Sequence, residues 1–218
     1  MRIALLTANI GGIDSLSGIR KQTKDFHYYP YFLNNLPYPL PNLNNRLKGK
    51  YVKIQSHRFL NHYDAYVWID GRVEVIGESF IELMVKDLCD EKPVSIFKHK
   101  DRDNIYQEIE YIQSNIKLGN PYLTKRYANQ NLESELEFYK NFGLKEDCQL
   151  YACTIFARLN NLKTNDAFDE WWRRILEFSL FDQTMFSYVK EKHKIKVNEL
   201  DYSLFEDQFI LNKHLINI

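Results

Sequence analysis

In the sequence YDAYVWIDGRVEV, residues 63–75, an apolar run is followed directly by an aspartate and a glycine. Residues 66–69 are continuously apolar, which is typical of a strand buried on both faces. Asp70 ends that strand, and a carboxylate there costs free energy unless it is paired, hydrogen-bonded or bound to a metal. Asp-Gly is also a common turn dipeptide, so the pattern alone leaves a functional aspartate and a turn aspartate open.

Strands and helices are expected to alternate on both sides of this segment. Apolar runs predict strands at 2–8, 26–32 and 94–97, a long strand or strand pair at 148–158, and a strand from 197 followed by irregular chain. Helical spacing predicts helices at 46–60, 80–88, 105–116, 131–142, 168–178 and 181–192, and the Pro- and Asn-rich residues 33–45 form a loop. This order is typical of a single α/β domain with a mixed, mainly parallel sheet flanked by helices.

Ligands of open α/β sheets bind beyond the carboxyl ends of the strands. The residues that follow the predicted strands are therefore candidates for a site: Asn9, Gly11, Asp70, His99 and Arg158. Gly11 and Gly12 have no Cβ, so a nucleotide could approach the backbone there. Neither a GxGxxG fingerprint nor a P-loop is present, and a plain strand-turn is the alternative.

Three basic residues on the predicted helix at 46–60 could bind a diphosphate. Lys53 and His57 are four residues apart and would share one helix face, with Arg46 further back. A solvated basic face is the alternative. The tyrosines between Tyr28 and Tyr38 could form an aromatic wall for a uracil or a sugar ring. Asp182 opens the last predicted helix, where an aspartate is commonly an N-cap, and it gains a functional meaning if that helix starts in the same cleft.

The composition excludes several classes of function. Lys plus Arg and Asp plus Glu both number 29, and this zero net charge argues against broad attraction to nucleic acid. The three cysteines form no CxxC pair, which fits a reducing compartment. No stretch approaches the roughly 20 apolar residues of a transmembrane helix, and the first apolar run is too short for a signal peptide. We therefore expect a soluble cytoplasmic protein, with peripheral attachment to a membrane pathway left open.

Several segments resemble, in the same order, motifs of the TOD/MUCI-type glycosyltransferase-like family. They are LLTANIGGIDSL at 5–16, NNRLKGKYVKIQSHRFLNHYDAYVWIDGRVEV at 44–75, FKHKDRDNIYQEIEYI at 97–112, FYKNFGL at 138–144 and WWRRILEFSLFDQTMFSYV at 171–189. The block around Trp-Ile-Asp-Gly and the Asp-Gln block are the more specific ones. The chain departs from the family pattern at Leu180-Phe181, where an arginine often precedes Asp-Gln, and Arg72 stands where the wider GT-A class has a second aspartate.

The resemblance implies a GT-A-like glycosyltransferase with a donor half at 1–100 and an acceptor half plus tail at 101–218. It implies a nucleotide-sugar donor (a UDP-sugar is favoured), a glycan, glycoprotein or glycolipid acceptor, and Mn²⁺ or Mg²⁺. The donor-binding residues that it implies are Thr7, Ala8, Asn9, Gly11, Arg46, Lys53, His57, Asp70 and Gly71. The implied acceptor- or sugar-binding residues are His99, Arg102 and Arg158, the implied metal ligands are Asp70 and His214, and the implied catalytic pair is Asp182 and Gln183.

Two roles for that pair stay open. Asp182 could act as the base toward the acceptor hydroxyl, or Asp182 and Gln183 could orient the donor sugar and steady its positive charge. Two other functions also stay open. One is a carbohydrate- or nucleotide-binding module of the same fold without turnover, which Arg72 supports, and the other is a nucleotidyltransferase.

Overall fold

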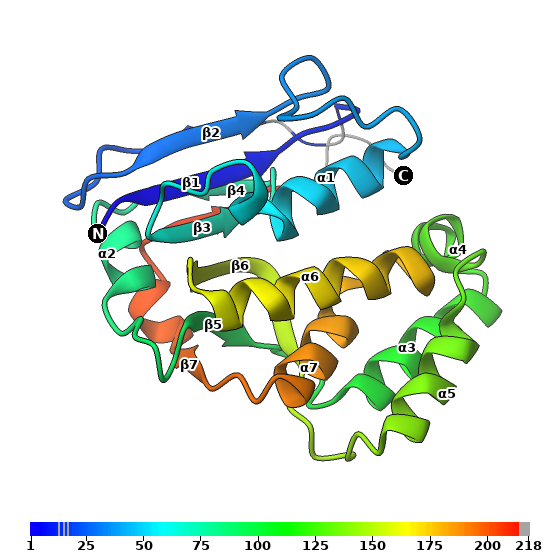
Figure 1. Cartoon of the computed structure of the whole chain (residues 1–218). Coiled ribbons are helices and arrows are strands. Elements are labelled where there is room, and N and C mark those ends of the chain that lie inside the picture. Colours follow the sequence, from blue (N-terminus) through cyan, green and yellow to red (C-terminus); the bar gives the residue numbers. More distant parts are fainter. Residues whose placement is uncertain (13, 15, 17, 214–218) are drawn as a thin grey trace.

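A computed structural model describes residues 1–12, 14, 16 and 18–213 of the chain. Its centre is a six-stranded sheet with the order β2-β1-β3-β6-β5-β7 (Figure 1). The strands are β1 (Ile3–Ala8), β2 (His27–Tyr31), β3 (Ala65–Ile69), β5 (Val94–Lys98), β6 (Tyr151–Leu159) and β7 (Val197–Leu200). All neighbours are parallel except β6, which runs antiparallel to both β3 and β5. The predicted mixed, mainly parallel sheet is confirmed.

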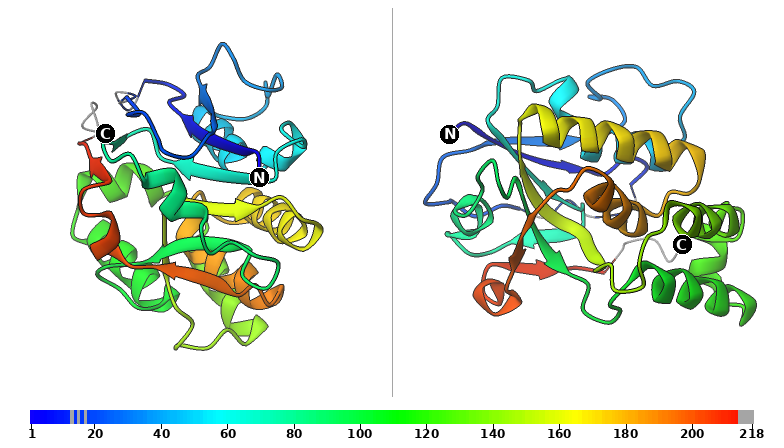
Figure 2. Two further views of the ribbon diagram at one scale, coloured as in Figure 1. Left: turned by 90° about the vertical axis from the view of Figure 1, so that its left-hand side faces the viewer. Right: turned by 60° about the horizontal axis from the view of Figure 1, so that its bottom comes forward.

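Helices cover both faces of this sheet, and its inner strands β1, β3 and β5 are accordingly buried along most of their length. The helices are α1 (Asn45–Ile54), α2 (Phe80–Val85), α3 (Ile105–Lys117), α4 (Pro121–Tyr127), α5 (Leu132–Phe142), α6 (Leu162–Glu177) and α7 (Asp182–Lys192). Helices α1, α6 and α7 pack on one face, whereas α2 and the short 3₁₀ helix Tyr202–Phe205 pack on the other. Figures 1 and 2 show α3, α4 and α5 grouped at one end of the molecule.

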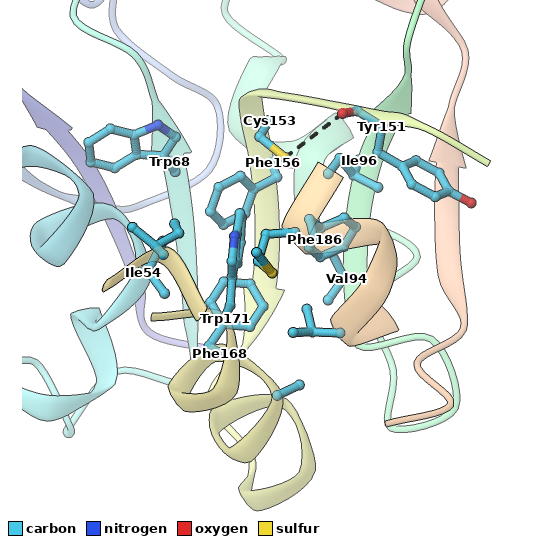
Figure 3. Close-up of a cluster of buried hydrophobic side chains, with 14 of the residues drawn as sticks. Ile54, Trp68, Val94, Ile96, Tyr151, Cys153, Phe156, Phe168, Trp171 and Phe186 are labelled. Carbon is cyan, nitrogen blue, oxygen red and sulfur yellow. Dashed lines mark hydrogen bonds between the residues drawn. The ribbon is translucent and has the colours of Figure 1, made fainter. Parts of the chain in front are cut away.

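The larger core cluster lies between the sheet and α1, α6 and α7. Trp68 from β3 and Phe156 from β6 face Trp171 from α6 and Phe186 from α7 (Figure 3). The next residues along each strand point to the opposite face, because side chains alternate along a strand. Val67 and Ile69 accordingly pack against α2 in the second cluster. Asp70 follows immediately, so two buried layers fix where its carboxylate emerges.

The geometry of the turn after β3 explains why a glycine, Gly71, follows Asp70. The Val73 amide donates to the Asp70 carbonyl at 2.9 Å, which closes a tight turn. A Cβ at Gly71 would lie 3.1 Å from the Ala8 carbonyl oxygen and 3.0 Å from the Asp14 carboxylate. The turn therefore presses against the end of β1, and only a residue without a side chain allows that approach. Beyond it, β4 (Val73–Val75) leaves the main sheet and pairs with β8 (Phe209–Leu211).

Several predicted boundaries differ from those of the structure. The helix expected at 46–60 ends at Ile54, and Ser56–Arg58 forms a separate 3₁₀ turn. Helix α6 begins earlier than expected because the Asn161 side chain accepts from the Thr164 amide at its N-terminus. Helix α4 was not predicted. Its N-cap Asn120 and the following Pro121 are start signals that its short length concealed. Among the described residues, no helix is both long and apolar enough to cross a bilayer.

The tryptophan pair of α6 offers a test of the core. Trp171 is 0% exposed and lies 5.2 Å from the Phe186 ring and 5.1 Å from the Phe168 ring, whereas the adjacent Trp172 is only partly buried. We expect Trp171→Ala to lower the free energy of unfolding by about 3–5 kcal/mol, because it leaves a large cavity. Trp172→Ala should cost clearly less. Urea unfolding followed by circular dichroism measures both, and equal losses would contradict this assignment of the core.

Candidate active site

Two adjoining cavities open at the carboxyl ends of β1 and β3. We call the first the β1 cavity. It has a volume of about 380 Å³ and lies between the ends of β1 and β3, helix α1 and the end of α4. We call the second the α7 cavity. It has a volume of about 370 Å³ and lies between α3, α4 and the first residues of α7. Lys50, Asp70 and Arg126 line both, so the two cavities form one continuous site.

The site is built around a buried ammonium group. The Nζ atom of Lys53 lies 2.6 Å from Oδ2 of Asp182 and 3.2 Å from Oδ1 of Asp70. Its side chain is only 3% exposed. The Nζ atom of Lys50, one turn earlier on α1, also lies 2.6 Å from Asp182 Oδ2, and the Trp68 indole donates to Asp70 Oδ1 at 2.7 Å. Lys53 on α1 thus connects Asp70 at the end of β3 to Asp182 at the start of α7, and Lys50 on the same helix adds a second contact to Asp182.

These contacts shift the pKa values of the buried groups. Burial alone would raise the pKa of Asp182, but the ammonium groups of Lys50 and Lys53 hold it far below its ordinary value. Burial alone would lower the pKa of Lys53, but the carboxylates of Asp182 and Asp70 hold it above its ordinary value. Asp182 is therefore ionised and Lys53 charged throughout the physiological pH range.

The β1 cavity is strongly cationic. Its basic residues are Arg46, Lys50, Lys53, Lys125 and Arg126, and its acidic ones are Asp14 and Asp70. One nitrogen of the Arg46 guanidinium donates to the Arg126 carbonyl at 2.9 Å, while its other terminal nitrogen is buried without a partner among the described residues. An unpaired buried donor costs free energy, so this cavity suits an anionic ligand that would accept from it.

The α7 cavity combines charged and aromatic side chains. Arg102 forms an ion pair with Glu108, which also accepts from the Gln183 amide at 3.4 Å. The Arg102 guanidinium stacks over the Tyr111 ring at 4.2 Å. Two further tyrosines, Tyr122 and Tyr127, come from α4. Aromatic faces beside hydrogen-bonding groups are suited to a sugar ring.

The structure brings most of the predicted site residues together. Ala8, Asn9, Arg46, Lys53, Asp70 and Gly71 line the β1 cavity. Asp70, His99, Arg102, Asp182 and Gln183 line the α7 cavity. Lys50, Trp68 and Arg126 also belong to the site and were not predicted. The position of Lys50, three residues before Lys53 on the same helix, was the signal that could have revealed it.

The structure does not bring His57 and Arg158 to these cavities. Strand β6 is antiparallel, so Arg158 pairs with Tyr66 near the start of β3, at the edge of the sheet opposite Asp70. There its guanidinium donates to the Nδ1 atom of His57 at 3.0 Å. His57 lies beyond the end of α1 and does not share the face of Lys53, and its Nε2 atom lies 3.0 Å from Asp169.

Four other expectations fall outside the cavities or the described residues. Thr7 is buried and Gly11 lies beside Asn45, and neither lines the β1 cavity or the α7 cavity. Tyrosines between Tyr28 and Tyr38 line neither cavity, and the aromatic wall comes from α3 and α4 instead. His214 lies outside the described residues.

The described residues do not fit a protein-held divalent metal. Such an ion prefers several oxygen ligands, and the described part of the chain holds no group of three acidic, histidine or cysteine side chains that could provide them. Asp70 Oδ1 already accepts from Lys53 and Trp68, and Arg72 lines the α7 cavity close by. The metal implied by the resemblance therefore stays a prediction without a donor set among these residues.

Comparison with known proteins places the chain in a family. Residues 32–215 match the family described as "TOD1/MUCI70, glycosyltransferase-like domain". The chain belongs to this family. A TOD1/MUCI70 relative, the "Probable hexosyltransferase MUCI70" of Arabidopsis thaliana, is 26% identical over an alignment of 179 residues that covers 76% of this chain. The matched part is 28% of the length of that relative. The resemblance seen in the motifs is confirmed.

Solved structures confirm the GT-A-like fold. Mouse xyloside xylosyltransferase 1 superposes with a TM-score of 0.53 over 92% of this chain and 85% of its own, at 8% identity. The bifunctional glycosyltransferase WbbM superposes with a TM-score of 0.50 over 89% of this chain and 38% of its own, at 12% identity. At such low identity the likeness concerns the fold alone.

A buried carboxyl group holds the segment that leads into α7. Glu135 is 0% exposed and accepts from the hydroxyls of Ser179 at 2.5 Å, Thr184 at 2.5 Å and Tyr139 at 2.6 Å. Burial raises the pKa of Glu135, against the effect of these hydrogen bonds. These bonds tie both sides of Asp182 to α5.

We expect Glu135→Ala to lower the free energy of unfolding by about 3 kcal/mol or more, because three buried hydroxyls lose their partner. Glu135→Gln keeps the shape and should cost less. Hydrogen exchange in the alanine variant should quicken at the first turn of α7 more than in α6. Uniform quickening would contradict this local role.

The His57 cluster predicts a pH-dependent stability. Burial and the Arg158 guanidinium lower the pKa of His57 to about 4, despite Asp169. An unfolded histidine titrates near pH 6.5, so between that pH and 4 the unfolded state binds more protons and stability falls as pH falls. We expect a loss of about 1–2 kcal/mol from His57 between pH 7 and 5. Urea unfolding of the wild type and His57→Gln at both pH values measures it, and equal pH dependence would contradict the prediction.

Proposed function

We propose that the chain is a glycosyltransferase domain that transfers a hexosyl or pentosyl group from a nucleotide-sugar donor to a glycan, glycoprotein or glycolipid. The observation that carries this is a cationic cavity joined to an aromatic one at Lys50, Asp70 and Arg126, with Asp182 paired to Lys50. A nucleotide sugar has an anionic diphosphate next to a neutral ring, and the pair of cavities matches that order. Family membership and the name of the Arabidopsis relative support the same class of reaction.

The β1 cavity is the proposed site of the nucleotide and its diphosphate. Glycosyl transfer leaves negative charge on the departing diphosphate, and fixed cations lower the free energy of that charge in the transition state. Lys50 and Arg46 line this cavity and are suited to that task. A UDP-sugar is the first candidate donor.

The α7 cavity is the proposed site of the donor's sugar ring and of the acceptor that meets it. Its tyrosines offer ring faces, and Gln183 and Arg102 offer hydrogen-bond donors to hydroxyl groups. Asp182 lines this cavity next to Gln183 and pairs with Lys50, which lines both cavities.

The strongly lowered pKa of Asp182 favours one of its two candidate roles. A carboxylate with a very low pKa is a weak base, since an efficient general base has a pKa near the working pH. The same carboxylate stays ionised and can stabilise positive charge on the sugar as the bond to the diphosphate breaks. We propose that Asp182 acts in this electrostatic way, with Gln183 beside it.

The test is a thermal-shift panel of UDP-, GDP-, ADP- and CMP-sugars, in Mn²⁺ and separately in EDTA, followed by assay of nucleotide release. We expect one donor class to raise the melting temperature and to be turned over. Asp182→Asn should lower turnover by about 100-fold, because it removes one charge at the reacting sugar. Asp166→Asn, an exposed change on α6 that borders neither cavity, is the matched control and should leave turnover unchanged.

Other outcomes separate the rival functions. A donor that binds without any release of nucleotide would instead indicate a binding module of this fold. Release of pyrophosphate from a nucleoside triphosphate would indicate a nucleotidyltransferase. If no nucleotide sugar shifted the melting temperature in either condition, the proposed function would be wrong.

A further inference from the structure

We propose that Lys50, Lys53 and Arg72 take the place of a divalent metal ion, so that this site binds the donor diphosphate without metal. The inference rests on the proposed function and concerns how the same site neutralises its substrate. It starts from a disagreement: the fold class implies a metal at Asp70, and the described residues do not supply its ligands.

Lys53 already performs the structural task of a bridging cation. Its ammonium joins Asp70 and Asp182, at 3.2 Å and 2.6 Å, in a setting where its side chain is 3% exposed. Two carboxylates brought together in a buried site repel each other unless a positive group lies between them. Here that group is part of the chain, and no additional ion is needed to hold the two elements together.

Lys50 is placed to transfer this positive charge to a ligand. It lines both cavities, and its side chain is 18% exposed, against 3% for Lys53. Because Lys53 independently pairs with Asp182, Lys50 can turn toward a phosphate without leaving that carboxylate unpaired. A lysine ammonium carries three donors on a flexible stem, which suits such a movement.

Arg72 supplies a third positive group next to Asp70. It lies two residues after Asp70, across the turn closed by the Val73 amide, and it lines the α7 cavity. An acidic residue at this position would add a metal ligand, whereas a guanidinium repels a metal and binds phosphate oxygens in a bidentate manner. The substitution of an arginine here therefore changes the chemistry of the site in the same direction as the two lysines.

The charge of the whole site agrees with this reading. The basic residues that line the two cavities are Arg46, Lys50, Lys53, Arg72, Arg102, Lys125 and Arg126. The acidic residues that line them are Asp14, Asp70, Glu108 and Asp182. A sugar nucleotide brings two negative charges on its diphosphate, and the excess of cations on the chain is sufficient to offset them.

Isothermal titration calorimetry on the whole chain tests the inference, with inorganic pyrophosphate and UDP as probes. Each is titrated in EDTA and in Mn²⁺. We expect both to bind in EDTA, with affinities that Mn²⁺ improves by less than about 10-fold, a factor that corresponds to one strong interaction. An improvement of 100-fold or more in Mn²⁺ would overturn the inference.

Two lysine variants sharpen the test. Lys50→Met should weaken pyrophosphate binding in EDTA by about 10-fold or more, as expected for a lost charge-assisted hydrogen bond. Lys48→Met is the matched control, because it removes the same charge from the same helix at a position near Leu36 and Tyr38, away from both cavities. Equal effects of the two would overturn the inference. Melting temperatures establish that each variant is folded.

The substitution Asp70→Asn is expected to change UDP affinity in opposite directions at a metal site and at the proposed metal-free site. At a metal site this change removes a ligand, so UDP binding in Mn²⁺ weakens. At the proposed site it frees Lys53 from one carboxylate while the amide oxygen still accepts from Trp68, so UDP binding in EDTA is retained or strengthened. A loss of UDP affinity in this variant would contradict the inference.

The outcomes also distinguish this inference from the proposed function. Nucleotide sugars that bind only with Mn²⁺ would overturn the metal-free site and leave the glycosyltransferase standing. Pyrophosphate binding in EDTA without binding of any nucleotide sugar would leave the cationic site standing and contradict the glycosyltransferase. Binding of neither probe in either condition would overturn both.

Discussion

The buried ammonium of Lys53 is the interaction on which the site depends. It joins Asp70 and Asp182, which lie 17 and 129 residues after Lys53 in the chain. Removing one partner of such a cluster leaves an uncompensated charge in a low-dielectric setting, which is strongly destabilising. The end of β3 and the start of α7 are therefore fixed to α1 by the same Lys53 ion pairs that place Asp70 and Asp182 in the site. Glu135 binds the residues on both sides of Asp182 through Ser179 and Thr184.

The two carboxylates converge because the sheet is not uniform. β1 and β3 are parallel, so the end of β1 and Asp70 share one edge of the sheet. β6 returns antiparallel beside β3, and α6 carries the chain back along the sheet to α7, whose first residue Asp182 then faces the same edge. The reversed strand separates two polar clusters. Arg158 and His57 meet at one edge and hold the fold, whereas Lys53 and its carboxylates meet at the other and face the cavities.

Local sequence patterns predicted those structural features that depend on residues adjacent in the chain, such as strand ends and helix starts. The apolar run before Asp70 placed that carboxylate at a strand end, and the motifs placed Asp182 and Gln183 at a helix start, as observed. Arg158 was misplaced because apolar runs do not reveal strand direction. His57 was misplaced because the helix ends six residues before the expected position, so His57 lies beyond it. Tyr122 and Tyr127 were missed because α4 is too short for a periodic signal.

A lysine-based site couples binding to stability more tightly than a metal site does. A metal exchanges with solvent, so a metal site can lose its ion and keep its fold. Lys53 cannot leave, and its charge is balanced by the carboxylates of Asp70 and Asp182. The same two carboxylates that oppose phosphate binding are thus needed to keep the ammonium buried. Lys50 is more exposed and shares Asp182 with Lys53. It is therefore the group that can bind a phosphate while Asp182 stays paired with Lys53.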